Sequence, residues 1–183
     1  MSLLKTTRVY TGRIVSLDVD TVQFPNGTVG ELEMLRHPGA SAVLPFLDDP
    51  QDGDPRVLLI RQYRHATGDY LWEIPAGRRD AGEAPEQTAV RELREETGYT
   101  CTNLHKLTWI WTTPGFTDEV IHLFMASGLT PGETAHEDDE ILDVHTLRWS
   151  EVRRMIRDGM IVDAKTLVTL LYAESEVRRP PSR

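Results

Sequence analysis

The sequence predicts an α/β protein in which one main domain of mixed strands and helices follows a small N-terminal β lobe. The chain has 183 residues, which suits one ordinary domain with a small extra lobe but not two full domains. Residues 8–36 show only short extended segments, whereas strand and helix patterns alternate further along the chain. Hydrophobic residues make up 39% of the chain and charged residues 27%, a composition that supports a folded core.

Three parts are predicted along the chain. Residues 1–38 form an antiparallel β lobe, in which residues 24–27 (Phe-Pro-Asn-Gly) supply the turn between two strands. Residues 39–175 form the main domain. Residues 176–183 include two consecutive prolines, which exclude a helix, and we expect them to form a disordered tail.

The main domain is predicted to begin with two interior strands, residues 42–47 and 57–60, because both runs are apolar and a loop rich in Asp, Pro and Gly separates them. A helix is predicted over residues 86–97, since Pro85 suits its first turn and Gly98 ends it. Shorter patterns of the same kind predict the remaining elements: strands over residues 107–111, 120–126 and 141–147, and helices over residues 150–157 and 164–174.

Charge and cysteine content exclude several classes of partner. Acidic residues outnumber basic ones by 29 to 20, and the formal charge of −9 repels polyanions, so a nucleic-acid partner is not expected. Cys101 is the single cysteine, which rules out an intramolecular disulfide and indicates the cytoplasm. No apolar run approaches the length that a membrane span requires, so a membrane partner is not expected either.

The predicted helix over residues 86–97 carries three carboxylates on one face. At about 100° per residue, Glu92, Glu95 and Glu96 lie within an arc of roughly 100°. Like charges at this spacing destabilise an isolated helix by about 0.2–0.5 kcal/mol per pair unless a cation neutralises them. Mg²⁺ and Mn²⁺ take such oxygen ligands and keep waters that a phosphate can displace. The helix alone leaves a second interpretation open, a solvated acidic face balanced by arginines.

A fixed spacing of charged residues and glycines surrounds these carboxylates. It comprises Gly77, Glu83, Arg91, Glu92, Leu93, Glu95, Glu96, Gly98 and Tyr99. This spacing resembles the Nudix hydrolase signature at every specified polar and glycine position. Tyr99 is the one departure, because the signature has an aliphatic residue there, and we expect the ring to fill a core position. A phosphate-binding P-loop is excluded, since Glu83 stands where that loop needs a lysine.

The Nudix resemblance implies an α/β/α sandwich with a mixed sheet and hydrolysis of a nucleoside diphosphate linked to another group. Within the family the chain resembles the ADP-ribose (ADP-sugar) pyrophosphatases, through residues 10–12, 61–64, 71–77 and 113–119. This implies Mg²⁺-dependent hydrolysis of ADP-ribose to AMP and a sugar phosphate. Two alternatives remain: a pyrophosphatase for another nucleoside diphosphate derivative, such as GDP-mannose or a dinucleotide, and a non-catalytic domain that senses a nucleotide.

The resemblance also implies roles for residues of the metal site. The Ala76 carbonyl, Glu92 and Glu96 would bind Mg²⁺, or Mn²⁺ in its place, and Glu95 would complete or bridge the cluster. Arg91 would orient these carboxylates.

Substrate contacts are implied further from the helix. Arg64 would grip the diphosphate, and Glu119 would lie near the substrate. Glu140 would activate or position the attacking water, with Asp138 as second choice. Four aromatic residues are candidates for stacking on the base, without a preference among them: Tyr10, Phe24, Tyr63 and Trp72.

Relatives in this subgroup imply a homodimer in which the N-terminal lobe, residues 1–38, contributes to the interface. Arg36, at the end of that lobe, would then contribute a contact to the partner's substrate pocket.

Overall fold

The computed structural model describes residues 1–133 and 142–177, and the chain divides into two compact units. The N-terminal unit comprises Met1–Gly39 and Trp111–Val120, and the main unit comprises the rest of the described chain. Of the predicted tail, residues 178–183 lie outside the described residues, as does Ile141 at the start of one predicted strand.

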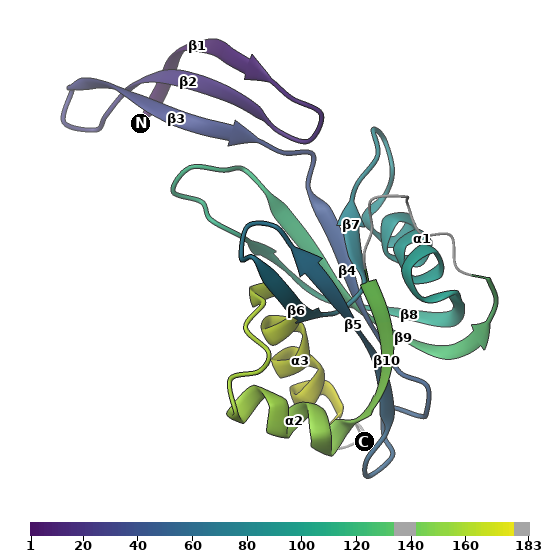
Figure 1. Cartoon of the computed structure of the whole chain (residues 1–183). Coiled ribbons are helices and arrows are strands. Elements are labelled where there is room, and N and C mark those ends of the chain that lie inside the picture. The colour runs from purple at the N-terminus through teal and green to yellow at the C-terminus, as the bar shows by residue number, and fades with distance from the viewer. Residues whose placement is uncertain (134–141, 178–183) are drawn as a thin grey trace, which may run out of the picture. The chain divides into compact units, whose positions relative to one another are not determined.

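The N-terminal unit is built on a three-stranded antiparallel sheet (Figure 1). Its strands are β1 (Ser2–Thr11), β2 (Ser16–Gln23) and β3 (Val29–Arg36), in that order. Gly27 adopts φ 84° in the predicted turn between β2 and β3, and its N–H donates to the Phe24 carbonyl at 2.9 Å. Strand β1 begins six residues before the extended segments that the sequence predicts. Every residue of β1 is exposed, so the strand lacks the alternation that would have revealed it.

A four-stranded mixed sheet forms the centre of the main unit. Its order is β7 (Ala76–Arg78), β4 (Ala40–Pro45), β9 (Val120–Pro131) and β8 (Tyr99–Trp111). Strand β4 pairs antiparallel with β7 and parallel with β9, and all six of its residues are buried. This arrangement confirms the mixed sheet.

A second, antiparallel sheet has the order β10, β5, β6. These strands span Leu142–Arg148, Arg56–Arg64 and Asp69–Glu73. Strands β6 and β7 were not predicted, because runs of five and three residues are too short to establish a pattern.

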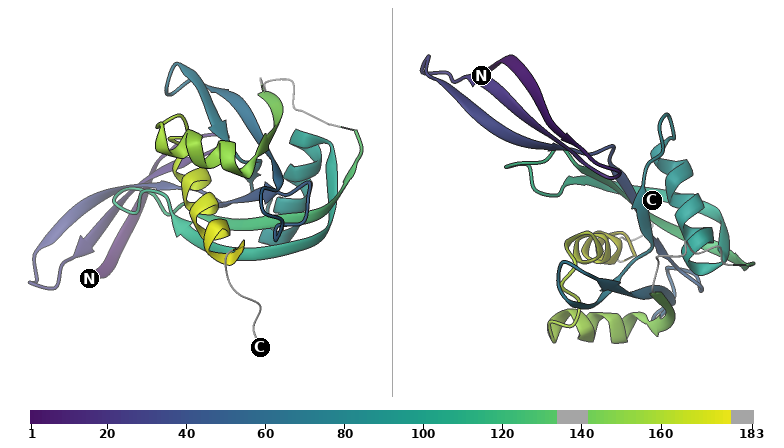
Figure 2. Two further views of the ribbon diagram at one scale, coloured as in Figure 1. Left: turned by 90° about the horizontal axis from the view of Figure 1, so that it is seen from below. Right: turned by 45° about the horizontal axis from the view of Figure 1, so that its top comes forward.

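Helices lie on both sides of the strands of the main unit, as the views in Figures 1 and 2 show. Helix α1 (Pro85–Thr97) packs against β4 and β7. On the other side, α2 (Trp149–Arg157) packs against β10, and α3 (Ala164–Val177) packs against β4 and β6. The α/β/α sandwich is thereby confirmed. None of the described helices is long and apolar enough to cross a bilayer.

The predicted caps fix α1 in place. Pro85 is its first residue, and Gly98 follows its last with φ 76°, its N–H bonded to the Arg94 carbonyl at 2.8 Å. Tyr99 packs, as expected, against the buried cluster that includes Leu93 and Phe124.

Candidate active site

Helix α1 turns two of its three predicted carboxylates into the protein. Glu92 is 7% exposed and Glu96 1% exposed, whereas the Glu95 side chain keeps 27% of its surface in solvent. One oxygen of Glu96, Oε2, accepts the Ala76 N–H at 3.0 Å. The helix therefore holds Glu96 against β7 through the backbone of the residue whose carbonyl is the predicted ligand.

Gly77 leaves the space that Glu92 occupies. A Cβ atom at this position would lie 2.0 Å from Glu92 Oε1 and 2.2 Å from its Cδ, far inside van der Waals contact. Only glycine admits the carboxylate at this distance from the strand. The structure thus gives a physical reason for a glycine that the sequence marked by spacing alone.

Arg91 connects the carboxylates of Glu92 and Glu95. Its Nη1 donates to Glu92 Oε1 at 2.6 Å and to Glu95 Oε2 at 3.0 Å. Its Nε and Nη2 donate to the two oxygens of Glu83 at 3.0 and 3.1 Å, and Nη2 also donates to the Arg78 carbonyl at 3.0 Å. One guanidinium therefore fixes the positions of both glutamates relative to the loop before the helix.

Glu83, for which no role was predicted, accepts two hydrogen bonds from Arg91. Its pKa is lowered to about 2, chiefly by the hydrogen bonds from Arg91 and to a smaller extent by those from the Asp80 N–H and the Thr88 hydroxyl, although burial opposes the shift. The signature spacing included Glu83, but only the folded loop shows that its charge serves to hold Arg91.

The donor set of this site fits a hard divalent cation. No group of three or more His, Cys, Asp or Glu side chains within the described ranges already converges as a metal cluster. The oxygen donors are nevertheless adjacent, because Glu92 lies over Gly77 and Glu96 is bonded to Ala76. Carboxylate and carbonyl oxygens are the ligands that Mg²⁺ and Mn²⁺ prefer, whereas thiolate or imidazole ligands would indicate another metal.

Arg64, at the end of β5, is held by a buried carboxylate. Its Nε and Nη2 each donate to one oxygen of Glu73 at 2.8 Å. Burial is the largest influence on Glu73 and raises its pKa, but Arg64 and Lys165 together outweigh it and leave the pKa below its usual value. The Arg64 side chain is still 40% exposed, and these two bonds leave its Nη1 edge for a phosphate.

Two predicted substrate residues, Arg36 and Glu119, belong to the N-terminal unit. Arg36 is bonded there to Asp18, Asp20 and Asp118, with 3.1 Å from its Nε to Asp18 Oδ2. Glu119 Oε1 lies 3.3 Å from His37 Nδ1. The structure thus brings the α1 carboxylates, Ala76 and Arg91 together in the main unit, where Arg64 interacts electrostatically with Glu96. It places Arg36 and Glu119 in the N-terminal unit.

The predicted water-activating residue, Glu140, lies outside the described residues, as does Asp138. Its role therefore stays a prediction.

The four aromatic candidates for stacking on the base lie in different environments. Phe24 packs over Gly30, where a Cβ atom would lie 2.8 Å from its ring, so it fills space inside the lobe. Tyr10 and Tyr63 are exposed, and Trp72 stacks edge-on against His145 with 4.8 Å between ring centroids. These contacts do not select one residue for a base.

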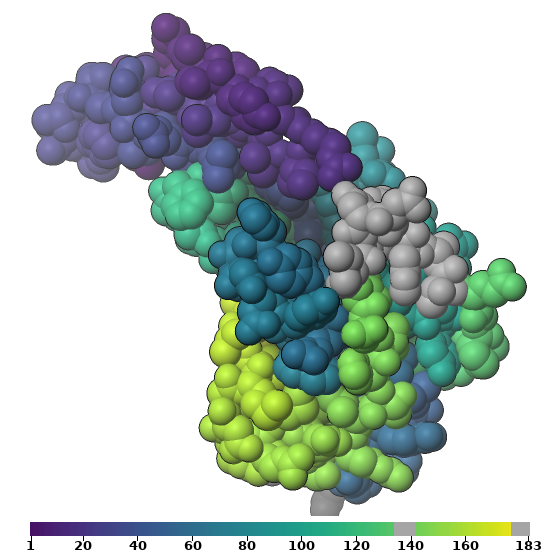
Figure 3. Space-filling view, viewed as in Figure 1, coloured from purple at the N-terminus to yellow at the C-terminus, as the bar shows by residue number. Residues whose placement is uncertain are grey.

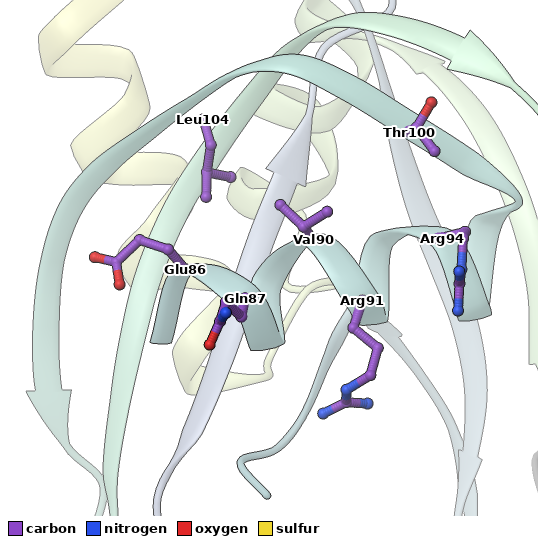
Figure 4. A pocket seen from close by; sticks show the side chains of 7 residues that line it. All are labelled: Glu86, Gln87, Val90, Arg91, Arg94, Thr100 and Leu104. Carbon is purple, nitrogen blue, oxygen red and sulfur yellow. The ribbon is translucent and has the colours of Figure 1, made fainter. Parts of the chain in front are cut away.

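A cavity of about 560 Å³ lies between α1 and β8 (Figure 4). Its lining residues are Glu86, Gln87, Val90, Arg91, Arg94, Thr100 and Leu104. Val90 stands two residues before Glu92, so the two side chains leave the helix on nearly opposite faces. The cavity therefore lies on the opposite face of α1 from Glu92, and Arg91 borders both the cavity and the carboxylates.

Known proteins resemble this chain in sequence and in fold. The model of the NUDIX domain matches residues 36–170. The methanol dehydrogenase activator of Bacillus methanolicus is 39% identical, over 93% of this chain and 91% of its own length. The ADP-ribose pyrophosphatase of Bacillus subtilis is 36% identical, over 91% of this chain and 89% of its own length. A solved structure of an ADP compounds hydrolase superposes with a TM-score of 0.82 at 22% identity, covering 97% of this chain and 94% of that one.

The last likeness shows the fold alone, whereas the family model and the two relatives cover most of the sequence. The α1 carboxylates, Arg91 and Gly77 lie within the matched range. The chain therefore belongs to the Nudix hydrolase family.

Proposed function

We propose that this Nudix hydrolase is a Mg²⁺-dependent pyrophosphatase that splits ADP-ribose, or a related ADP-sugar, into AMP and a sugar phosphate. The observation that carries the proposal is the buried pair Glu92 and Glu96 beside Ala76 and Gly77. Similarity to a protein named ADP-ribose pyrophosphatase, over most of both chains, supports the choice of substrate.

In this proposal Glu92, Glu96 and the Ala76 carbonyl hold the metal, and Glu95 completes the set. A bound Mg²⁺ or Mn²⁺ neutralises charge on the diphosphate oxygens and lowers the pKa of the attacking water. Arg91 keeps Glu92 and Glu95 in place through the bonds from its Nη1.

Arg64 binds the diphosphate in the same proposal. Its planar guanidinium is oriented by Glu73, so the free Nη1 edge can hold phosphate oxygens in a fixed direction. Preorganising this cation reduces the entropy that substrate binding would otherwise lose.

Water activation is assigned to Glu140, with Asp138 as second choice. The three helix glutamates are already engaged with Arg91 or Ala76, which favours a base from elsewhere. The discriminating comparison is kcat for Glu140→Gln against Glu95→Gln. The proposal holds if Glu140→Gln lowers kcat by a factor of about 10² to 10⁴ with metal affinity unchanged. It is wrong if only Glu95→Gln has this effect.

Substrate preference is tested with ADP-ribose, GDP-mannose, a dinucleotide and ATP at one Mg²⁺ concentration. We expect ADP-ribose to have the highest kcat/KM, at least about tenfold above ATP. Higher activity on GDP-mannose or a dinucleotide would keep the pyrophosphatase and correct its substrate. Binding without turnover of any compound would instead favour the nucleotide sensor.

We also propose a homodimer formed through the N-terminal unit. Leu3, Val9, Tyr10 and Val29 are each about 60% exposed on its sheet, an apolar area that a second subunit would cover. Arg36 is the residue proposed to reach the partner's pocket. Light scattering should give twice the mass of one chain.

We further propose that the protein is located in the cytoplasm. Its single cysteine, Cys101, supports this location, because proteins of oxidising compartments commonly carry paired cysteines. Cell fractionation tests the proposal.

A further inference from the structure

We infer that the first turn of α3 is a positioning unit for the active site, in which Lys165 orients Arg64 through Glu73 and Thr166 positions Ala76 through Ile74. The inference rests on the proposed roles of Arg64 and Ala76. It assigns a role at that site to residues of α3, which begins about 70 positions after the end of α1 along the chain.

The first arm is a chain of buried charges. Lys165 Nζ donates to Glu73 Oε2, and the same carboxylate accepts both bonds from Arg64. The Glu73 side chain is 1% exposed and that of Lys165 is 11% exposed. A carboxylate held from two sides cannot rotate without breaking a charge-assisted hydrogen bond, so Lys165 fixes the plane in which Arg64 presents its free edge.

The second arm reaches the metal site through the backbone. Thr166 is fully buried, and its Oγ1 accepts the Ile74 N–H at 3.0 Å. From Ile74 the chain passes through Pro75, whose φ is fixed by its ring and whose carbonyl accepts the Val43 N–H at 2.9 Å. The next residue is Ala76. Because few dihedral angles separate Ile74 from Ala76, a shift at Thr166 moves the Ala76 carbonyl.

Asp163 joins the two arms. Its Oδ2 accepts from Lys165 Nζ at 3.1 Å, from the Thr166 N–H at 3.0 Å and from Thr166 Oγ1 at 2.6 Å. Asp163 directly precedes α3, so one oxygen both caps the helix and holds the two side chains that point to the site. Figure 3 shows the yellow surface of α3 directly beside the blue surface of the β5 and β6 region, as the α3 to β6 packing requires.

Capping of α3 does not by itself explain the buried ion pair between Lys165 and Glu73. Capping requires only an acceptor for the Thr166 N–H, which Asp163 supplies without Lys165 or Glu73. Burying a lysine and a glutamate costs desolvation that well-packed apolar side chains would avoid. The charged pair is therefore better explained by the position it gives Arg64 than by stability.

Two variants separate the arms by their kinetics. Lys165→Met should raise KM for ADP-ribose about tenfold with kcat within about twofold, because a mispositioned Arg64 weakens ground-state and transition-state binding alike. Lys165→Arg, which keeps the charge, should restore KM. The matched control is Arg153→Met, which removes a cation paired with Glu174 between α2 and α3 and should leave KM unchanged.

Thr166→Val should lower kcat about tenfold and weaken Mn²⁺ binding to the substrate-free protein about tenfold, measured by electron paramagnetic resonance. Thr166→Ser should restore both values. The matched control is Thr169→Val, one turn further along α3, where an equally buried hydroxyl donates to the Lys165 carbonyl and not to Ile74. If Thr166→Val does not fold, Thr166→Cys, with its weak sulfur acceptor, replaces it.

The inference is overturned if the folded Lys165 and Thr166 variants match their controls in KM, kcat and Mn²⁺ affinity. A wild-type protein that does not hydrolyse ADP-ribose would contradict the proposed function instead. The Mn²⁺ measurement would then still decide the Thr166 arm, since it needs no turnover.

Discussion

Glu96→Gln is expected to lower kcat/KM for ADP-ribose by about 10² to 10³ or more while the protein stays folded. The loss follows because a neutral amide replaces a ligand charge that would stabilise the transition state. Folding should change little, since the amide oxygen of glutamine can still accept the Ala76 N–H that Glu96 Oε2 accepts at 3.0 Å. Steady-state kinetics with Mg²⁺, together with a thermal unfolding curve, checks both parts.

The matched control is Glu86→Gln on the same helix. Glu86 lies in the first turn of α1 and lines the cavity away from the carboxylate site, so its substitution should leave kcat/KM unchanged. Near wild-type activity of Glu96→Gln would show that the buried face of α1 is not the metal site.

Gly77→Ala is expected to lower kcat/KM by at least about 10², because the new methyl group would occupy the place of the Glu92 carboxylate. Its Cβ would lie 2.0 Å from Glu92 Oε1, so Glu92 must leave β7. Misplacing a group at a reacting centre by even about 1 Å can have an effect of this size. Kinetics and Mn²⁺ affinity should both show the loss.

Gly53→Ala serves as the control for this change. No heavy atom lies within 4 Å of a Cβ built on Gly53, so a methyl group there should have no effect on activity. A double variant separates the cause: if Gly77→Ala acts through Glu92, adding Glu92→Gln should lower activity less than the product of the two single effects. Fully multiplicative losses would contradict that coupling.

Local patterns sufficed to predict α1, which carries the proposed carboxylate ligands, but not the three-residue strand β7, which carries Ala76 and Gly77. Pro85 and Gly98 mark the ends of α1, and the spacing of Glu92 and Glu96 places both on one face. The first six residues of the exposed β1 and the whole of the short β6 escaped prediction, because neither carries a periodic burial pattern of useful length.

Sequence patterns could not predict the contacts between residues that lie far apart along the chain. Glu73 meets Lys165 across 92 positions, and Thr166 meets Ile74 across the same separation. Neither pair leaves a local periodicity, since each depends on α3 packing against β6. The resemblance predicts that Arg64 binds phosphate, but only the fold shows the Glu73 carboxylate that holds its guanidinium.

The most direct test of a metal-dependent pyrophosphatase centred on Glu92 and Glu96 is ADP-ribose turnover by metal-stripped protein, followed as Mg²⁺ is added back. AMP and ribose 5-phosphate are resolved by chromatography at each concentration. We predict no measurable AMP in excess EDTA and full recovery of the rate with Mg²⁺, because the donor set consists of carboxylate and carbonyl oxygens. An undiminished rate in excess EDTA would contradict the metal site and the reaction built on it.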